Sequence, residues 1–107
     1  MAKIALPVNG DDIEKLVAKH FGWAKNYLIY DTVSDGFEVV ANPEAEGKKT
    51  LPPKFLDQHG VDAVICFDLG SRAVNFFNQL GIDVFKAVGS SLKENIGRFK
   101  KGQLVVY

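Results

Sequence analysis

Few side chains in this 107-residue chain could carry metal or redox chemistry. The two histidines are His20 and His59, and the single cysteine is Cys66. These three residues cannot supply the four protein ligands that an iron-sulfur cluster or a structural zinc site usually needs. One or two ligands could still hold a preassembled cluster for a short time, so any metal binding is expected to be transient.

His20 is the candidate metal ligand. It precedes Phe21 and Gly22 in an expected loop at the edge of a sheet, where an imidazole nitrogen could bind iron. A surface histidine that makes only local hydrogen bonds is the alternative. His59, just before Gly60, is expected to place favourable charge at a helix C-terminus and has no predicted ligand role.

Cys66 lies one residue before the end of the apolar run from Ala63 to Phe67. Its thiolate could approach a ligand at the carboxyl edge of the sheet, where ligands bind in open α/β folds. The competing interpretation is an inert core thiol, since free cysteines are among the most buried residues. The sequence favours the core thiol and leaves the choice open.

A second candidate is the turn from Asp68 to Arg72, which connects a predicted strand to a predicted helix. Free backbone amides around Gly70 could face an anion, and Arg72 could clamp a carboxylate or phosphate. In the alternative, Ser71 or Asp68 caps the helix and Arg72 is solvated. The spacing matches neither a phosphate-binding loop nor a dinucleotide fingerprint.

Catalysis has little support in the sequence. A magnesium-dependent nuclease needs clustered carboxylates that typically begin on the first strand, yet Lys3 to Val8 contains no acid. The Ser90-Ser91 pair shows no nucleophile-elbow or triad signature. We therefore predict a binding protein and not an enzyme.

Alternating strands and helices are expected to position these residues. Runs of apolar, aromatic and β-branched residues predict five strands of a mixed sheet with helices packed against it. The strands are Lys3 to Val8, a hairpin of Tyr27 to Tyr30 with Phe37 to Val40, Ala63 to Phe67, and Ile82 to Phe85.

Helical spacing and capping residues predict four helices. They run from Asp11 to about His20, from Thr50 to Gly60 with Leu51, Phe55 and Leu56 buried, from Ser71 to Gly81, and from Ser91 to Gly102. The polar segment Asn42 to Lys49 lacks periodicity and is expected to be a mobile loop.

The parallel arrangement of the first and central strands predicts where a site would form. Turns that follow parallel strands emerge at the same carboxyl edge of the sheet. We therefore expect Asn9 and Gly10, the Asp68-to-Arg72 turn and His20 to surround one shallow pocket.

Composition and charge indicate which binding partners and which cellular location to expect. Thirteen Lys and Arg balance thirteen Asp and Glu, so no net field favours nucleic acid or an anionic membrane. No apolar run reaches membrane-spanning length, and the start of the chain shows no signal peptide. We expect one domain over residues 1–107, located in the cytoplasm.

Four segments together resemble the dinitrogenase iron-molybdenum cofactor biosynthesis family of the NifX, NafY and NifB C-terminal type. They are Lys3 to Asn9; His20 to Ala24 before Tyr27 to Asp31; Pro52 to Leu56 before Gly60 to Asp62; and Ala63 to Ala73 before Leu80 to Ile82. The resemblance implies a ribonuclease-H-like fold with a mixed five-stranded sheet and an association with metal-cluster handling.

Two positions depart from the family pattern. Members often carry Arg after His-Phe-Gly, where this chain has Trp23, and many have Cys or a His/Gly-rich loop before the Pro-Pro pair, where Leu51 stands. Both departures remove polar or ligating capacity.

The resemblance and the residues together predict a carrier or accessory protein for an iron-sulfur or iron-molybdenum type cluster. The predicted contacts are His20 as the metal ligand, with Asn9, Gly10, Gly70 and Arg72 around it. The partner would be the cluster or a cluster-assembly protein. The alternative is a protein-interaction module of the same fold that has lost metal binding, with Trp23 as a possible surface anchor.

Overall fold

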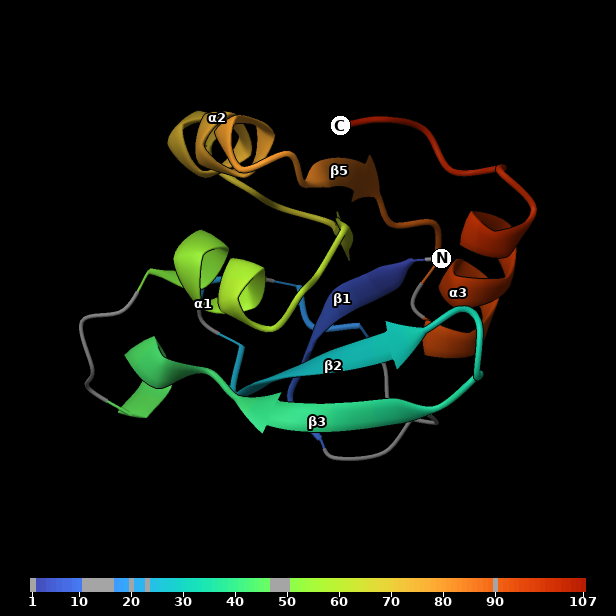
Figure 1. Cartoon of the computed structure of the whole chain (residues 1–107), viewed down its shortest axis with the longest axis horizontal. Helices are drawn as coiled ribbons and strands as arrows, with labels where there is room; N and C mark the ends of the chain where they lie inside the picture. Colours follow the sequence, from blue (N-terminus) through green and yellow to red (C-terminus); the bar gives the residue numbers. More distant parts are fainter. Residues whose placement is uncertain (1, 11–16, 20, 23, 47–50, 90) are drawn as a thin grey trace.

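The computed structural model describes residues 2–10, 17–19, 21–22, 24–46, 51–89 and 91–107. One mixed sheet has the strand order β3-β2-β1-β4-β5 (Figure 1). Its strands are β1 (Lys3–Val8), β2 (Asn26–Asp31), β3 (Phe37–Ala41), β4 (Ala63–Cys66) and β5 (Asp83–Lys86). The helices are η1 (Pro43–Glu46, a 3-10 turn), α1 (Pro52–Gln58), α2 (Ser71–Gln79) and α3 (Leu92–Lys100).

The predicted mixed five-stranded α/β sheet is confirmed. β1 pairs antiparallel with β2 and parallel with β4, and β4 pairs parallel with β5. β2 and β3 form the predicted antiparallel hairpin. Turns that follow β1 and β4 therefore leave the sheet at the same edge, which is the condition for a shared site.

Side chains alternate between two apolar cores, one on each face of the sheet. In β4, Val64 and Cys66 face the core that contains Leu56 of α1 and Phe77 of α2. Ala63 and Ile65 face the core that contains Leu92 and Ile96 of α3. Figure 1 shows α3 on the opposite side of the sheet from α1 and α2.

Helix ends follow local chemistry. Pro52 and Pro53 occupy the first positions of α1, as predicted, where a missing backbone donor costs little. The Ser91 hydroxyl caps α3 by accepting from the Glu94 amide at 3.1 Å. Gly60, with φ of 74°, terminates α1 in the left-handed conformation that glycine adopts easily.

The prediction of a mobile loop over Asn42 to Lys49 is wrong for its first half. Pro43–Glu46 forms η1, and the Asn42 side chain is fully buried. That side chain donates to the carbonyls of Gly22 and Ala24 at 3.1 and 2.9 Å and accepts from the Glu44 amide. The remaining positions of the predicted loop lie outside the described residues.

The helix predicted from Asp11 to about His20 falls mainly outside the described residues. Its described part is not helical, because Val17 forms an antiparallel bridge with Val8 and the Ala18 amide donates to Pro7 O at 2.6 Å. The end of the chain adds a similar bridge, between Val106 and Phe85 of β5. In the described part of the chain, no helix has the length and apolar character needed to cross a membrane.

Candidate functional site

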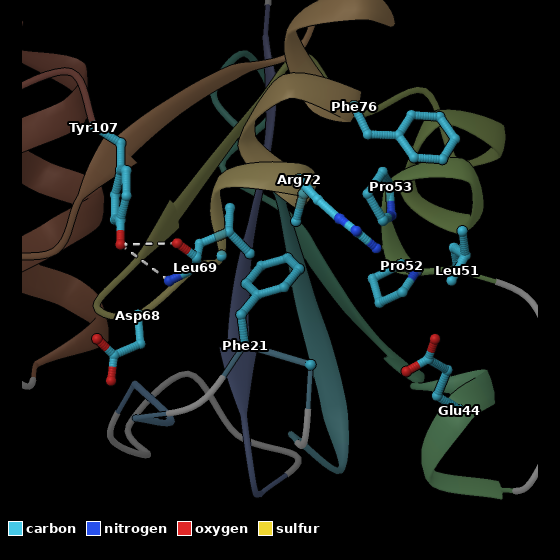
Figure 2. Close-up of a pocket in the computed structure, with 13 residues that line it drawn as sticks. Phe21, Glu44, Leu51, Pro52, Pro53, Asp68, Leu69, Arg72, Phe76 and Tyr107 are labelled. Atoms are coloured by element: carbon cyan, nitrogen blue, oxygen red, sulfur yellow. Dashed lines mark hydrogen bonds between the residues drawn. The ribbon is translucent and has the colours of Figure 1, made fainter.

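A cavity of about 710 Å³ lies where the turn after β4 meets the start of α1 (Figure 2). Residues distant in sequence form its wall, because the sheet brings several chain segments to one edge. They come from the Asp68-to-Arg72 turn, Leu51 to Pro53, Phe21 and Gly22, Glu44, Ala73, Phe76 and Tyr107.

The apolar part of the wall is anchored in the core. Phe21 is 2% exposed and packs edge-on against Phe77, with ring centroids 5.7 Å apart. The Tyr27 hydroxyl donates to Phe21 O at 3.0 Å, which fixes the backbone of this segment. Burial and, secondarily, the negative charge of Glu44 raise the pKa of Tyr27, so this hydroxyl remains a donor at neutral pH.

The start of α2 forms the polar part of the wall. Gly70 occupies the N-cap position, so the prediction that Ser71 or Asp68 caps this helix is wrong. Gly70 enters the helix in an extended conformation and has no side chain to cap it. The first helical bond joins the Val74 amide to Gly70 O at 3.0 Å, which leaves the amides of the first turn without helical partners.

Arg72 brings positive charge to the same wall. Figure 2 shows its guanidinium reaching across the cavity toward Pro52 and Pro53. Its side chain is exposed, and it forms no ion pair with another residue that the structure describes. Glu44 and Asp68 also line the cavity. A negatively charged ligand is therefore favoured beside α2 and disfavoured near the two carboxylates.

Tyr107 closes one side of the site. Its hydroxyl donates to Leu69 O and accepts from the Leu69 amide, both at 3.0 Å (Figure 2). The sequence did not identify this residue, because its position depends on the chain end returning along β5. Glu44 was missed for a related reason, since it reaches the cavity only through the buried anchor at Asn42.

Two of the predicted binding residues, Gly70 and Arg72, line the cavity. Asn9 and Gly10 do not. The Asn9 side chain accepts from the Lys25 amide at 3.2 Å, and Gly10 O accepts from the Asn26 side chain at 3.0 Å, so both hold the start of β2. His20 lies outside the described residues and directly precedes Phe21 of the cavity wall.

Neither Cys66 nor His59 lines the cavity. Cys66 is fully buried, and burial together with the nearby Asp68 raises the pKa of its thiol to about 12. A thiol that remains protonated is a poor metal ligand. The His59 ring lies edge-on to Phe55, and its Nδ1 is 3.8 Å from the Glu38 carboxylate.

Leu51 corrects a further prediction. It was expected on the buried side of α1, but its side chain is 51% exposed at the cavity. Among the described residues, no three side chains of His, Cys, Asp or Glu are grouped as a metal site would require.

Two proteins are related to this chain in sequence over nearly its whole length. An uncharacterised protein of Methanocaldococcus jannaschii is 31% identical over 110 residues, covering 97% of this chain and 90% of that protein. A solved structure of a candidate NifB protein from Thermotoga is 32% identical, with a TM-score of 0.83. The match covers 99% of this chain and 93% of the Thermotoga chain.

A more distant structure shares the fold. The apo form of the orange protein from Desulfovibrio gigas has a TM-score of 0.90 at 22% identity, covering 100% of this chain and 93% of that one. Residues 2–102 match the family described as dinitrogenase iron-molybdenum cofactor. That match spans nearly the whole sequence, and the chain therefore belongs to the dinitrogenase iron-molybdenum cofactor family.

Proposed function

We propose that this protein is a non-catalytic carrier or accessory protein that holds an iron-containing cluster, of the iron-sulfur or iron-molybdenum type, as its cargo. The observation that carries the proposal is the cavity whose wall combines Arg72 and the start of α2, which has no side-chain cap, with apolar side chains. Membership in the dinitrogenase iron-molybdenum cofactor family, and the similarity to a candidate NifB protein, support the same cargo class.

The cavity chemistry fits a preassembled anionic cluster. Such a cluster brings its own sulfides, so it needs few protein ligands and gains from positive charge and amide donors. Arg72 lies on one wall with Gly70 and Ala73 of the uncapped start of α2, and we propose that they provide the charge and the donors. The low number of ligands also favours release, which a carrier requires.

His20 is the metal ligand in this proposal. It is adjacent in sequence to Phe21, whose ring and backbone are fixed in the cavity wall. Cys66 is not a ligand, because its thiol is buried and protonated at physiological pH. We further propose a cytoplasmic location, with cluster-assembly proteins as partners and neither nucleic acid nor a membrane as a binding surface.

Anaerobic reconstitution with ferrous iron and sulfide tests the proposal. After desalting, iron and sulfide per chain and the visible absorption of the protein are measured. The parent protein is expected to retain iron, sulfide and absorption. Retention of neither iron nor absorption by the folded parent would contradict the carrier function.

His20→Ala tests the ligand, and His59→Ala is the matched control because His59, the C-cap of α1, lies beside Phe55 and Glu38. We expect His20→Ala to lose most of the retained iron and His59→Ala to keep it. Equal iron retention in folded His20→Ala and in the parent would show that His20 is not the ligand.

A protein-interaction module is the second candidate, favoured by one observation. Leu51 is half exposed and lines a largely apolar cavity together with Pro52 and Phe76. An apolar side chain in this place could contact a partner. In that case, Leu51→Asp would weaken partner binding, and the parent would retain no iron after reconstitution.

A further inference from the structure

Tyr107 forms hydrogen bonds to the backbone of the Asp68-to-Arg72 turn, which lines the cavity. Leu69 lies between Asp68 and Gly70, and Gly70 is the N-cap of α2. Its amide and its carbonyl both bond to the Tyr107 hydroxyl, at 3.0 Å each (Figure 2). A phenolic hydroxyl has one donor and free acceptor capacity, so one oxygen can serve both backbone groups.

Tyr107 is itself fixed relative to the sheet. Its amide donates to Val84 O in β5 at 2.8 Å, beside the bridge between Val106 and Phe85. The Lys86 ammonium lies 5.8 Å from the centre of the Tyr107 ring, a cation-π distance. Tyr107 therefore joins the turn to β5 by hydrogen bonds, through its hydroxyl at Leu69 and its amide at Val84.

This link acts on the polar wall of the cavity. Gly70 and Arg72 follow Leu69 by one and three residues, and both line the cavity with Tyr107. The direction in which the chain leaves Leu69 sets where the first-turn amides and the guanidinium of Arg72 point. Leu69 is partly exposed, so water could replace the phenol there without unfolding the protein.

We infer that Tyr107 is a positioning residue of the cofactor cavity: its hydroxyl holds the Asp68-to-Arg72 turn in the conformation that presents the α2 amides and Arg72 to an anionic ligand. This inference rests on the proposed function for the identity of the ligand. The positioning itself is a property of the protein without ligand. The two can therefore be tested separately.

Tyr107→Phe is the direct test because it removes the hydroxyl and keeps the ring and the bond from residue 107 to Val84. Tyr30→Phe is the matched control. The Tyr30 hydroxyl donates to Asp35 at the opposite edge of the sheet, and Tyr30 does not line the cavity. Both variants lose one phenolic oxygen, but only Tyr107→Phe loses the hydrogen bonds to the Asp68-to-Arg72 turn.

The first readout is the amide NMR spectrum of the protein without ligand. Tyr107→Phe should shift the amide resonances of residues 69–72 and speed their hydrogen exchange, while Tyr30→Phe leaves them unchanged. Unchanged shifts and exchange across residues 69–72 in Tyr107→Phe would overturn the positioning role. Equal thermal midpoints for both variants would show that a general loss of stability is not the cause.

The second readout is iron retention after anaerobic reconstitution with ferrous iron and sulfide, in competition with an iron chelator. The hydroxyl does not touch the ligand, so its loss acts through the population of the binding conformation. If that population falls about five- to thirtyfold, retention in Tyr107→Phe weakens by the same factor. The Tyr30→Phe control should match the parent. Parent-like retention in Tyr107→Phe would overturn the inference. If the parent itself retains no iron, the proposed cargo is wrong, and the NMR readout still decides the positioning role.

Discussion

At the scale of single residues, Arg72 carries the positive charge of the cavity. Its guanidinium has no ion-pair partner among the residues described and reaches across the cavity mouth (Figure 2). A long exposed side chain of this kind contributes little to stability. In the proposed function, this side chain contacts the cluster and does not support the fold.

Arg72→Gln should therefore weaken retention of an iron-sulfide cluster without destabilising the protein. Loss of one exposed charge-assisted contact predicts about three- to tenfold weaker retention, with a larger effect at low salt. The control is Arg98→Gln, since Arg98 pairs with Glu94 on α3, on the other face of the sheet. Chelator competition after reconstitution measures the difference. Equal retention in both variants would exclude a role for the Arg72 charge.

The buried hydrogen bonds of Asn42 could not be predicted from the residues around it in the sequence. Its sequence neighbours are polar and aperiodic, and these properties predicted a mobile loop. The fold instead brings the carbonyls of Gly22 and Ala24 to its side chain, from a segment about twenty residues earlier. Tyr107 was missed for the same reason. Hydrogen bonds between distant segments depend on the completed fold and leave no local periodicity in the sequence.

Asn42→Ala should destabilise the protein by about 2–4 kcal/mol, because it leaves buried backbone groups without partners. Urea unfolding followed by circular dichroism measures the free energy of unfolding. Asn75→Ala is the control, since Asn75 is exposed on α2 and alanine favours helix. The Asn75 variant should change stability by less than about 0.5 kcal/mol. A similarly small change in Asn42→Ala would contradict the buried-anchor role.

At the scale of elements, the sequence predicted the sheet well and some connections poorly. The continuous apolar run of β4 and the aromatic hairpin strands are local patterns that match the observed strands. Gly70 and Arg72 could be placed at the carboxyl edge because a parallel crossover determines where that turn emerges. Apolar spacing predicted that Val17 lies in a helix, but in the structure Val17 forms an antiparallel bridge with Val8.

One contact between elements predicts a pH dependence. Lys100 of α3 lies 2.7 Å from the Asp35 carboxylate in the β2-β3 turn, and the Tyr30 hydroxyl donates to the same oxygen. The hydrogen bond from Lys100, with that from Tyr30, holds the pKa of Asp35 below its ordinary 3.8. The stabilisation is therefore present above about pH 4 and is lost as the pH falls through the lower folded-state pKa.

Lys100→Met should raise the pKa of Asp35 in the folded protein. Carbon-13 NMR titration of the side-chain carboxyl measures the change directly. The acid side of the stability profile should flatten in the variant, because less of the carboxylate stabilisation remains to be lost. An Asp35 pKa that is equal in the variant and the parent would contradict the assigned contact.

At the scale of the whole molecule, the site belongs to no single segment. The five-stranded sheet separates two apolar cores and brings the turn after β4, the start of α1 and the chain end to one edge. Family membership agrees with this arrangement, and the solved Thermotoga relative has the same fold. We propose that this edge carries a cluster as cargo.

Native mass spectrometry of the anaerobically reconstituted protein tests that claim most directly, because it weighs the intact chain with its bound atoms. We predict a species heavier than the apo chain by a whole number of iron and sulfide atoms. That species should be diminished in His20→Ala and Arg72→Gln and retained in His59→Ala. A folded parent protein that shows only the mass of the apo chain, at iron and sulfide excess, would contradict the carrier function.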